Sequence, residues 1–157
     1  MPIDYGKKFE ERVREDFKKS FPNGLIYRLP DQMSGYKEVS QNPCDFIGYN
    51  LPYFFMLEAK SHKGASIPFD AIPQHERLER FIGIQGVRCG IILWLYEKDI
   101  VYYIPASTIT KMKKDGKKSV GIKAVEEGYN IKIIPSTKLR VFMESDYTFL
   151  MELKDGE

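Results

Sequence analysis

Hydrophobic side chains recur every four residues near the start of the chain, at Phe9, Val13 and Phe17. Residues four apart lie on the same face of a helix, one turn above each other. The pattern therefore predicts an amphipathic helix over residues 5–20, and the turn-forming residues 21–24 predict its end.

Short hydrophobic runs bounded by turn residues predict a series of strands further along the chain. We expect them at residues 25–29, 45–49, 53–60, 90–96 and 100–104. The same reasoning predicts an irregular strand at 129–134 and helices at 74–82, 105–113 and 146–153. Loops are expected in the segments 30–43 and 61–72, which contain Gly and Pro. This mixture predicts an α/β fold.

The expected strand 53–60 opens with uncharged hydrophobic residues, as strands buried on both faces do, and ends in charges. Side chains alternate along a strand, so Glu58 and Lys60 project from the same face. The turn at residues 50–52 predicts a hairpin with the preceding strand. Such a hairpin would bring Asp45 to the same end as Glu58.

Composition narrows the class of protein. The length suits a single domain, residues 1–157, and the 43% hydrophobic and 13% aromatic content argues against a disordered chain. A net charge of +2 does not by itself indicate a nucleic-acid partner. Lysines nevertheless gather on the first helix and at 111–118, where either a solvated surface or contact with phosphates would explain them.

The two cysteines, Cys44 and Cys89, are isolated, with neither a CxxC spacing nor paired histidines nearby. This argues against a structural zinc site and suits a reducing cytosol, with a single disulfide as the open alternative. The longest uncharged hydrophobic run, near residues 91–96, is too short to span a membrane, and the N-terminus lacks a signal-peptide pattern. We therefore expect a cytoplasmic protein without a membrane segment.

Carboxylates gathered at a strand end favour a hard metal ion, because Mg²⁺ and Mn²⁺ prefer oxygen ligands. We expect Asp45 and Glu58 to be ligands and the carbonyl of Ala59 to be a third. Glu10 lies at the edge of the first helix's buried face and is a further candidate, through water or at a second site. If the metal activates a water for attack on a phosphodiester, Lys60 would hold that water and screen the charge of the phosphate. The alternative is an ordinary Glu58–Lys60 ion pair, which would contribute little.

Gln74 begins the expected helix 74–82 and points the same way as Leu78, with His75 and Arg77 flanking this face. A glutamine there could be a helix cap, a satisfied polar group of the core, or a residue aimed at the reactive centre. The pattern alone leaves all three open.

In the order and the residue content of its motifs, the chain resembles the PD-(D/E)xK nucleases, and among them the RecU-type Holliday-junction resolvases. The resemblance rests on segments similar to the family's motifs: Gly6–Glu10, Cys44–Gly48, Leu57–Lys60, Ser66–Phe69, Gln74 and Gly116–Ser119. It implies a restriction-endonuclease-like core, in which helices flank a central mixed sheet. It also implies Mg²⁺- or Mn²⁺-dependent cleavage of branched DNA that leaves 5′-phosphates, by a homodimer of bacterial or phage type.

The same resemblance implies a set of functional residues. The catalytic ones would be Glu10, Asp45, Glu58, Lys60 and Gln74. The lysines expected to contact DNA are Lys7, Lys63, Lys113, Lys114, Lys117 and Lys118. A dimer interface could use residues 90–104 or 142–149, although packing in the core would account for these hydrophobic segments as well.

The chain departs from the family pattern in several places. Cys44 separates Pro43 from Asp45, so the Pro-Asp dipeptide is not intact, and Pro73 stands where the family has a histidine before the glutamine. The family's stalk insertion, which engages the junction centre, corresponds here only to about residues 30–43. The chain also starts almost at the expected first helix, without the family's long basic arm. These differences bear on the choice of DNA structure more than on catalysis.

Two alternatives stay open from the sequence. The chain could be a non-catalytic DNA-binding accessory protein of recombination that keeps the nuclease fold, although acids clustered near phosphates would not serve such a protein. It could also be an unrelated α/β protein in which Glu58-Ala-Lys60 arose by chance.

Overall fold

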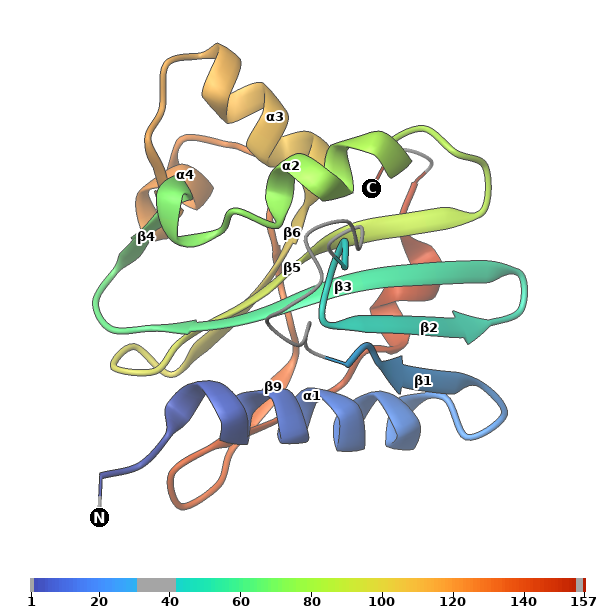
Figure 1. Cartoon of the computed structure of the whole chain (residues 1–157). Helices are drawn as coiled ribbons and strands as arrows, with labels where there is room; N and C mark the ends of the chain where they lie inside the picture. Colours follow the sequence, from blue (N-terminus) through green and yellow to red (C-terminus); the bar gives the residue numbers. More distant parts are fainter. Residues whose placement is uncertain (1, 31–41, 155–156) are drawn as a thin grey trace, which may run out of the picture.

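A mixed β-sheet runs through the middle of the molecule, and helices cover both of its faces (Figure 1). The computed structural model describes residues 2–30, 42–154 and 157. Within this part of the chain, six strands form the sheet in the order β1-β2-β3-β5-β6-β8. They are β1 (Leu25–Arg28), β2 (Phe46–Asn50), β3 (Tyr53–His62), β5 (Val87–Leu95), β6 (Ile100–Pro105) and β8 (Lys132–Ile133).

Hairpins make most of the strand pairs antiparallel, as in β2 with β3 and β5 with β6. The exception is β3 with β5, which run parallel from Phe54 opposite Val87 to His62 opposite Leu95. A parallel pair needs a crossover connection on one face of the sheet. The crossover contains the short strand β4 (Ser66–Pro68), the 3-10 helix η1 (Phe69–Ala71), α2 (His75–Leu78) and the 3-10 helix η2 (Glu79–Phe81).

One face of the sheet packs against helix α1 (Tyr5–Ser20), whose predicted stripe of Phe9, Val13 and Phe17 is buried there. The sheet contributes alternate residues of its central strands to the same core, among them Leu57 and Trp94. The C-terminal elements complete this layer: β9 (Ser136–Lys138), β10 (Met143–Ser145) and the 3-10 helix η3 (Thr148–Glu152). The predicted helix 5–20 is confirmed.

The opposite face is covered by α2 together with α3 (Ala106–Lys114) and α4 (Ile122–Glu126), above a core that includes Met56, Leu78 and Ile91. A strand preceding α4, β7 (Ser119–Gly121), pairs with β4 in a small separate sheet. Glu58 and Lys60 follow Met56 at intervals of two residues, so they project to this face.

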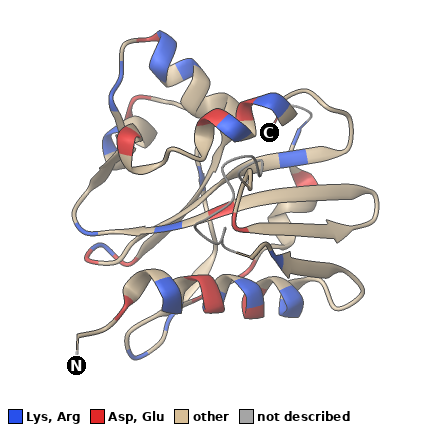
Figure 2. Ribbon diagram, viewed as in Figure 1, with Lys and Arg blue, Asp and Glu red and all other residues tan. Residues whose placement is uncertain are grey.

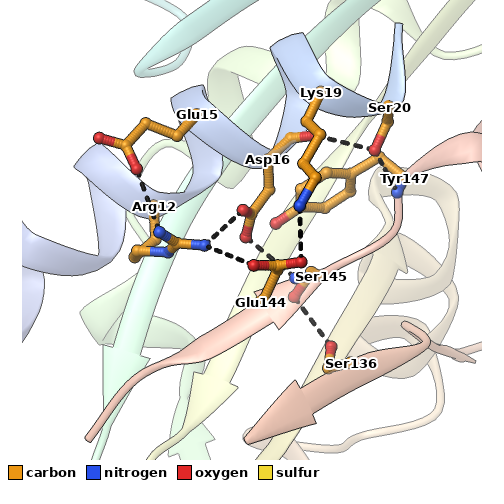
Figure 3. Close-up of polar contacts among 9 residues, drawn as sticks. All are labelled: Arg12, Glu15, Asp16, Lys19, Ser20, Ser136, Glu144, Ser145 and Tyr147. Carbon is orange, nitrogen blue, oxygen red and sulfur yellow. Dashed lines mark hydrogen bonds and ion pairs between the residues drawn. The ribbon is translucent and has the colours of Figure 1, made fainter. Parts of the chain in front are cut away.

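A buried carboxylate fastens α1 to the C-terminal hairpin (Figure 3). Asp16 is 3% exposed; its Oδ1 lies 2.6 Å from Nη2 of Arg12, and its Oδ2 accepts the N–H of Ser145 at 2.9 Å. Burial raises the pKa of Asp16, while the Ser145 amide and Arg12 oppose the rise. Beside it, Oγ of Ser20 accepts the N–H of Tyr147 at 2.9 Å. These contacts join segments that are far apart in the sequence.

Several expected elements need correction. The segment 61–72 is not simply a loop, because β3 continues into it and β4 and η1 follow. The helix at 74–82 divides into α2 and η2, and that at 146–153 is the 3-10 helix η3. Regular pairing in 129–134 is confined to β8. The sequence did not predict β7 or α4, which are too short for a visible hydrophobic period. Of the expected loop 30–43, residues 31–41 lie outside the described residues.

Cys44 and Cys89 are both free and buried, so the alternative of a disulfide between them is wrong. Burial raises the pKa of the Cys44 thiol to about 12 and that of the Cys89 thiol to about 11, which keeps both thiols protonated and poor metal ligands. Among the described helices, none has both the length and the apolar character that crossing a membrane requires.

Candidate active site

Strands β2 and β3 stop pairing where the expected site begins. Their last pair is Phe46 opposite Leu57, whereas β3 continues beside β5 as far as His62. Beyond Leu57, β2 no longer covers the edge of β3. Asp45, the residue before β2, takes its place there, since its Oδ2 accepts the N–H of Ala59 at 3.0 Å.

Glu58 is buried beside Asp45. It is 1% exposed, and extending the β2–β3 register by one residue sets it opposite Asp45, with both side chains on one face. Its Oε1 lies 3.5 Å from Nζ of Lys60, whereas its Oε2 is buried without a hydrogen-bond partner among the described residues. Burial, followed by the charge of Asp45, raises the pKa of Glu58 to about 8, and Lys60 opposes the rise.

The carbonyl of Ala59 is directed to the same edge. In an extended strand, the N–H and C=O of one residue point toward the same neighbouring strand. The N–H of Ala59 points to Asp45, so its carbonyl also faces the edge that β2 leaves uncovered.

These groups suit a small hard cation. Two carboxylates and a carbonyl are the oxygen ligands that Mg²⁺ takes, with waters completing its coordination. A cation would give Oε2 of Glu58 a partner and relieve its repulsion with Asp45. In the described part of the chain, no three side chains of His, Cys, Asp or Glu gather closely enough to hold a metal. The carbonyl of Ala59 and waters would therefore have to complete the coordination.

Glu10 is paired with an arginine of β1. Helix α1 packs on the face of the sheet opposite to the Glu58 side chain, and Oε2 of Glu10 accepts a hydrogen bond from Nε of Arg28 at 2.8 Å. The helical period correctly placed Glu10 at the edge of the buried face. It could not reveal Arg28, because that residue comes from β1 and no sequence spacing links the two.

Gln74 directly precedes α2, on the same side of the sheet as Glu58. It is the N-cap residue of α2, but its side chain makes no capping hydrogen bond, and its Oε1 is buried without a partner among the described residues. The prediction that His75 flanks the buried face is wrong. His75 is buried, with Nε2 3.3 Å from both the carbonyl of Ala106 and the hydroxyl of Thr110, because α3 covers this side of α2.

Arg77 connects α2 to the segment that enters the site. Its Nη1 donates to the carbonyl of Asn42 at 2.7 Å, shortly before Asp45 in the chain. Helical spacing placed Arg77 only as a flanking residue of the helix. No motif marks this contact, which helps to fix the position of the residues leading to Asp45.

The predicted DNA-contacting lysines occupy three regions of the surface. Lys7 lies in the first turn of α1, Lys63 follows β3, and the others surround the end of α3: Lys113, Lys114, Lys117 and Lys118. Lys117 is paired with Glu127 at 2.6 Å, and Lys63 lies 3.7 Å from Glu97. In the coloured ribbon of Figure 2, basic and acidic residues are mixed along α1, and basic residues lie at the end of α3.

Known proteins resemble this chain in sequence and in fold. The family model Recombination protein U matches residues 31–145, which is most of the chain. Among solved structures, the chain is similar to Hjc, a Holliday junction resolvase from the archaeal hyperthermophile Archaeoglobus fulgidus, with a TM-score of 0.57 and 19% identity. The match covers 79% of this chain and 94% of that one. No curated protein matches the chain. The predicted restriction-endonuclease-like fold is confirmed.

Proposed function

Because this chain belongs to the recombination protein U family, we propose that it is a metal-dependent endonuclease that hydrolyses phosphodiester bonds in branched DNA. The four-way junction is the substrate we expect, since Hjc, which shares the fold, is a Holliday junction resolvase. One observation carries the proposal: the buried Glu58 faces Asp45 with an unpaired Oε2, next to Lys60.

Asp45, Glu58 and the carbonyl of Ala59 would hold Mg²⁺ or Mn²⁺. When bound, such an ion polarises the scissile phosphate and lowers the pKa of a coordinated water. Lys60 is 25% exposed, and its contact with Glu58 keeps Nζ at the site. From there Nζ donates to the attacking water and stabilises the negative charge that develops on the phosphate.

Two further residues have supporting roles in this proposal. Gln74, at the start of α2, would orient the water or Lys60 through its buried Oε1. Glu10 would have to leave Arg28 before it could help to hold a second ion, so we place it outside the first metal site.

Substitution of the two carboxylates tests the proposal. Asp45→Ala and Glu58→Ala should abolish cleavage of four-way junction, flap, single-stranded and linear duplex DNA in Mg²⁺ or Mn²⁺, while binding in a gel shift stays measurable. Glu11→Ala, which removes an exposed carboxylate of α1, is the matched control and should cut normally. Full activity of either site variant would contradict the assignment of Asp45 and Glu58 as metal ligands. Failure of the wild type to cut any substrate in either metal would favour the DNA-binding accessory protein.

We further propose that the protein acts as a homodimer, because resolving a junction requires two cuts. The segments 90–104 and 142–149 are poor candidates for the interface, since most of their hydrophobic side chains pack in the core. Large exposed hydrophobic residues lie instead on β1, β2 and β3: Leu25, Tyr27, Tyr49 and Phe54. The register sets Leu25 beside Tyr49 and Tyr49 beside Phe54. We propose that a second copy of the chain covers this surface.

A further inference from the structure

A histidine lies on the same strand and the same face as Glu58 and Lys60. Strand β3 ends at His62, in a segment that the sequence predicted as a loop. Side chains alternate along a strand, so Glu58, Lys60 and His62 project to one face in a row. The register agrees with this, because His62 is paired with Leu95 of β5, which packs in the core of that face.

The imidazole of His62 is accessible to a ligand. The chain has two histidines, and His75 is fully buried, whereas His62 is partly exposed. Neither ring nitrogen of His62 is buried, and no hydrogen bond or ion pair in the described part of the chain uses the ring. An imidazole with unused nitrogens can donate an N–H to an anion that approaches from solvent.

The strand holds this histidine in place at an open edge. β3 pairs with β5 as far as His62, whose carbonyl accepts the N–H of Tyr96 at 3.2 Å. Along the other edge, β2 pairs with β3 only up to Leu57 (Figure 1). Glu58 is buried, whereas Lys60 and His62 are partly exposed, so the row leads from the core to the surface. A substrate can therefore approach the outer end of the row.

The spacing along the strand decides what His62 can contact. The described residues contain no three His, Cys, Asp or Glu side chains close enough to hold a metal, so His62 does not join Asp45 and Glu58 as a ligand. Residues two apart in a strand lie about 7 Å from each other, which is the distance from Lys60 to His62 along β3. Neighbouring phosphates of one DNA strand have a similar separation.

We propose that His62 binds the phosphate next to the scissile one in the cleaved strand, by donating a ring N–H to a phosphate oxygen. This inference rests on the proposed function, because it takes the scissile phosphate to lie at Glu58 and Lys60. The backbone of the cleaved strand then follows the row along β3, and His62 fixes its direction in the site. A phosphate contact of this kind positions DNA without reading its sequence.

A chemical double-mutant cycle on the full chain tests this contact. The wild type first defines the cleavage site in a four-way junction, and a neutral methylphosphonate then replaces the phosphate on either side of it. We expect one of these two replacements to lower kcat/KM about tenfold, and His62→Phe to lower it about tenfold on unmodified DNA. The two changes together should cause no further loss, because each removes the same hydrogen bond. Losses that multiply, no loss with either methylphosphonate, or a normal rate for His62→Phe would overturn the proposal.

Two further variants separate the contact from a change in the strand. His62→Gln keeps an N–H donor near the position of Nε2 and should recover part of the lost rate. Ser61→Ala alters the neighbouring residue, which projects to the opposite face, and should cut like the wild type. Circular dichroism checks that each variant is folded. A His62→Gln rate no higher than that of His62→Phe, or an equal loss in Ser61→Ala, would overturn the proposal.

A binding experiment keeps this proposal apart from the proposed function. Junction DNA is added to the wild type in chelator, and the ring C–H resonance of His62, assigned by its loss in His62→Phe, is followed by NMR. We expect DNA to shift this resonance. If DNA shifts it but is not cut when metal is supplied, the proposed function fails and a DNA contact of His62 remains. Cutting of DNA without such a shift would overturn the His62 contact alone, and absence of both would overturn both proposals.

Discussion

Glu58 combines two conditions that rarely coexist at one carboxylate. It is buried next to a second carboxylate, and one of its oxygens has no partner among the described residues. Burial and the charge of Asp45 both favour the protonated form, which explains why its pKa rises to about 8. Without a cation, Glu58 therefore holds a proton at neutral pH, and binding of a metal has to displace it.

The first prediction concerns stability without metal. The pKa of Glu58 is about 8 in the folded protein against 4.5 as its ordinary value, so the folded state binds the extra proton between these values. The associated stability is fully present below the lower value and is lost as the pH rises through the higher one. In chelator, the unfolding free energy of Glu58→Gln minus that of the wild type should therefore grow from about pH 5 to about pH 8 and then level off. Urea titrations measure this difference, and a value independent of pH would contradict the assigned pKa.

The second prediction separates Lys60 from the ligands. Lys60→Ala should lower turnover by about 10²–10⁴-fold, the range for a lost proton donor or acceptor, and should leave Mn²⁺ affinity largely intact. Because Lys60 lowers the pKa of Glu58, its loss raises that pKa further, so calorimetric titrations of Mn²⁺ at several pH values are needed to separate proton release from metal affinity. Lys98→Ala, at an exposed lysine in the β5–β6 turn, is the control. Loss of Mn²⁺ binding together with turnover would assign Lys60 to the structure of the site instead.

At the scale of elements, α1 is held on the sheet by its hydrophobic stripe and on the C-terminal hairpin by Asp16. The third prediction is that Asp16→Ala lowers the unfolding free energy by about 3 kcal/mol, because it leaves Arg12 and the Ser145 N–H without their buried acceptor. Glu15→Ala removes an exposed partner of the same arginine and should cost under about 0.5 kcal/mol. Urea unfolding measures both variants. Equal effects would mean that the buried contact contributes no more than an exposed one.

Elements with a long hydrophobic period were predictable, and those made by distant pairing were not. Helix α1 and the β2–β3 hairpin follow from local spacing, and so does the meeting of Asp45 with Glu58. Strands β4 and β7 have three residues each and exist because they pair with each other across many residues of sequence. His75 was misplaced for a related reason: helical spacing shows only one buried face, and α3 creates a second.

The candidate site was predictable only as far as it lies on neighbouring strands. Asp45, Glu58 and Ala59 meet through one hairpin, whose register follows from its turn. The partners of Glu10 and Arg77 come from β1 and from the segment before β2, so no pattern along the chain could reveal them.

At the scale of the whole molecule, the fourth prediction concerns the proposed dimer. Tyr27 is 68% exposed on β1, with Tyr49 on the same sheet face, and burying a charge against this surface would be costly. Tyr27→Glu combined with Tyr49→Glu should therefore convert a dimer into a folded monomer. Light scattering after gel filtration measures the mass, and circular dichroism checks the fold. Ile133→Glu, at an exposed residue of the opposite edge strand β8, should leave the dimer intact. A double variant that stays dimeric would place the interface elsewhere.

The unequal lengths of β2 and β3 have a mechanical consequence. From Phe54 to His62, β3 is paired with β5 along its other edge, so the strand that carries Glu58 and Lys60 is fixed even where β2 has ended. Residues fixed in this way cannot move toward a phosphate. If the protein has the proposed function, the DNA has to bend for its phosphate to reach these residues. A nucleic acid with a flexible branch point bends at a lower energetic cost than a continuous duplex. Selectivity for branched DNA would then arise from the stiffness of the protein.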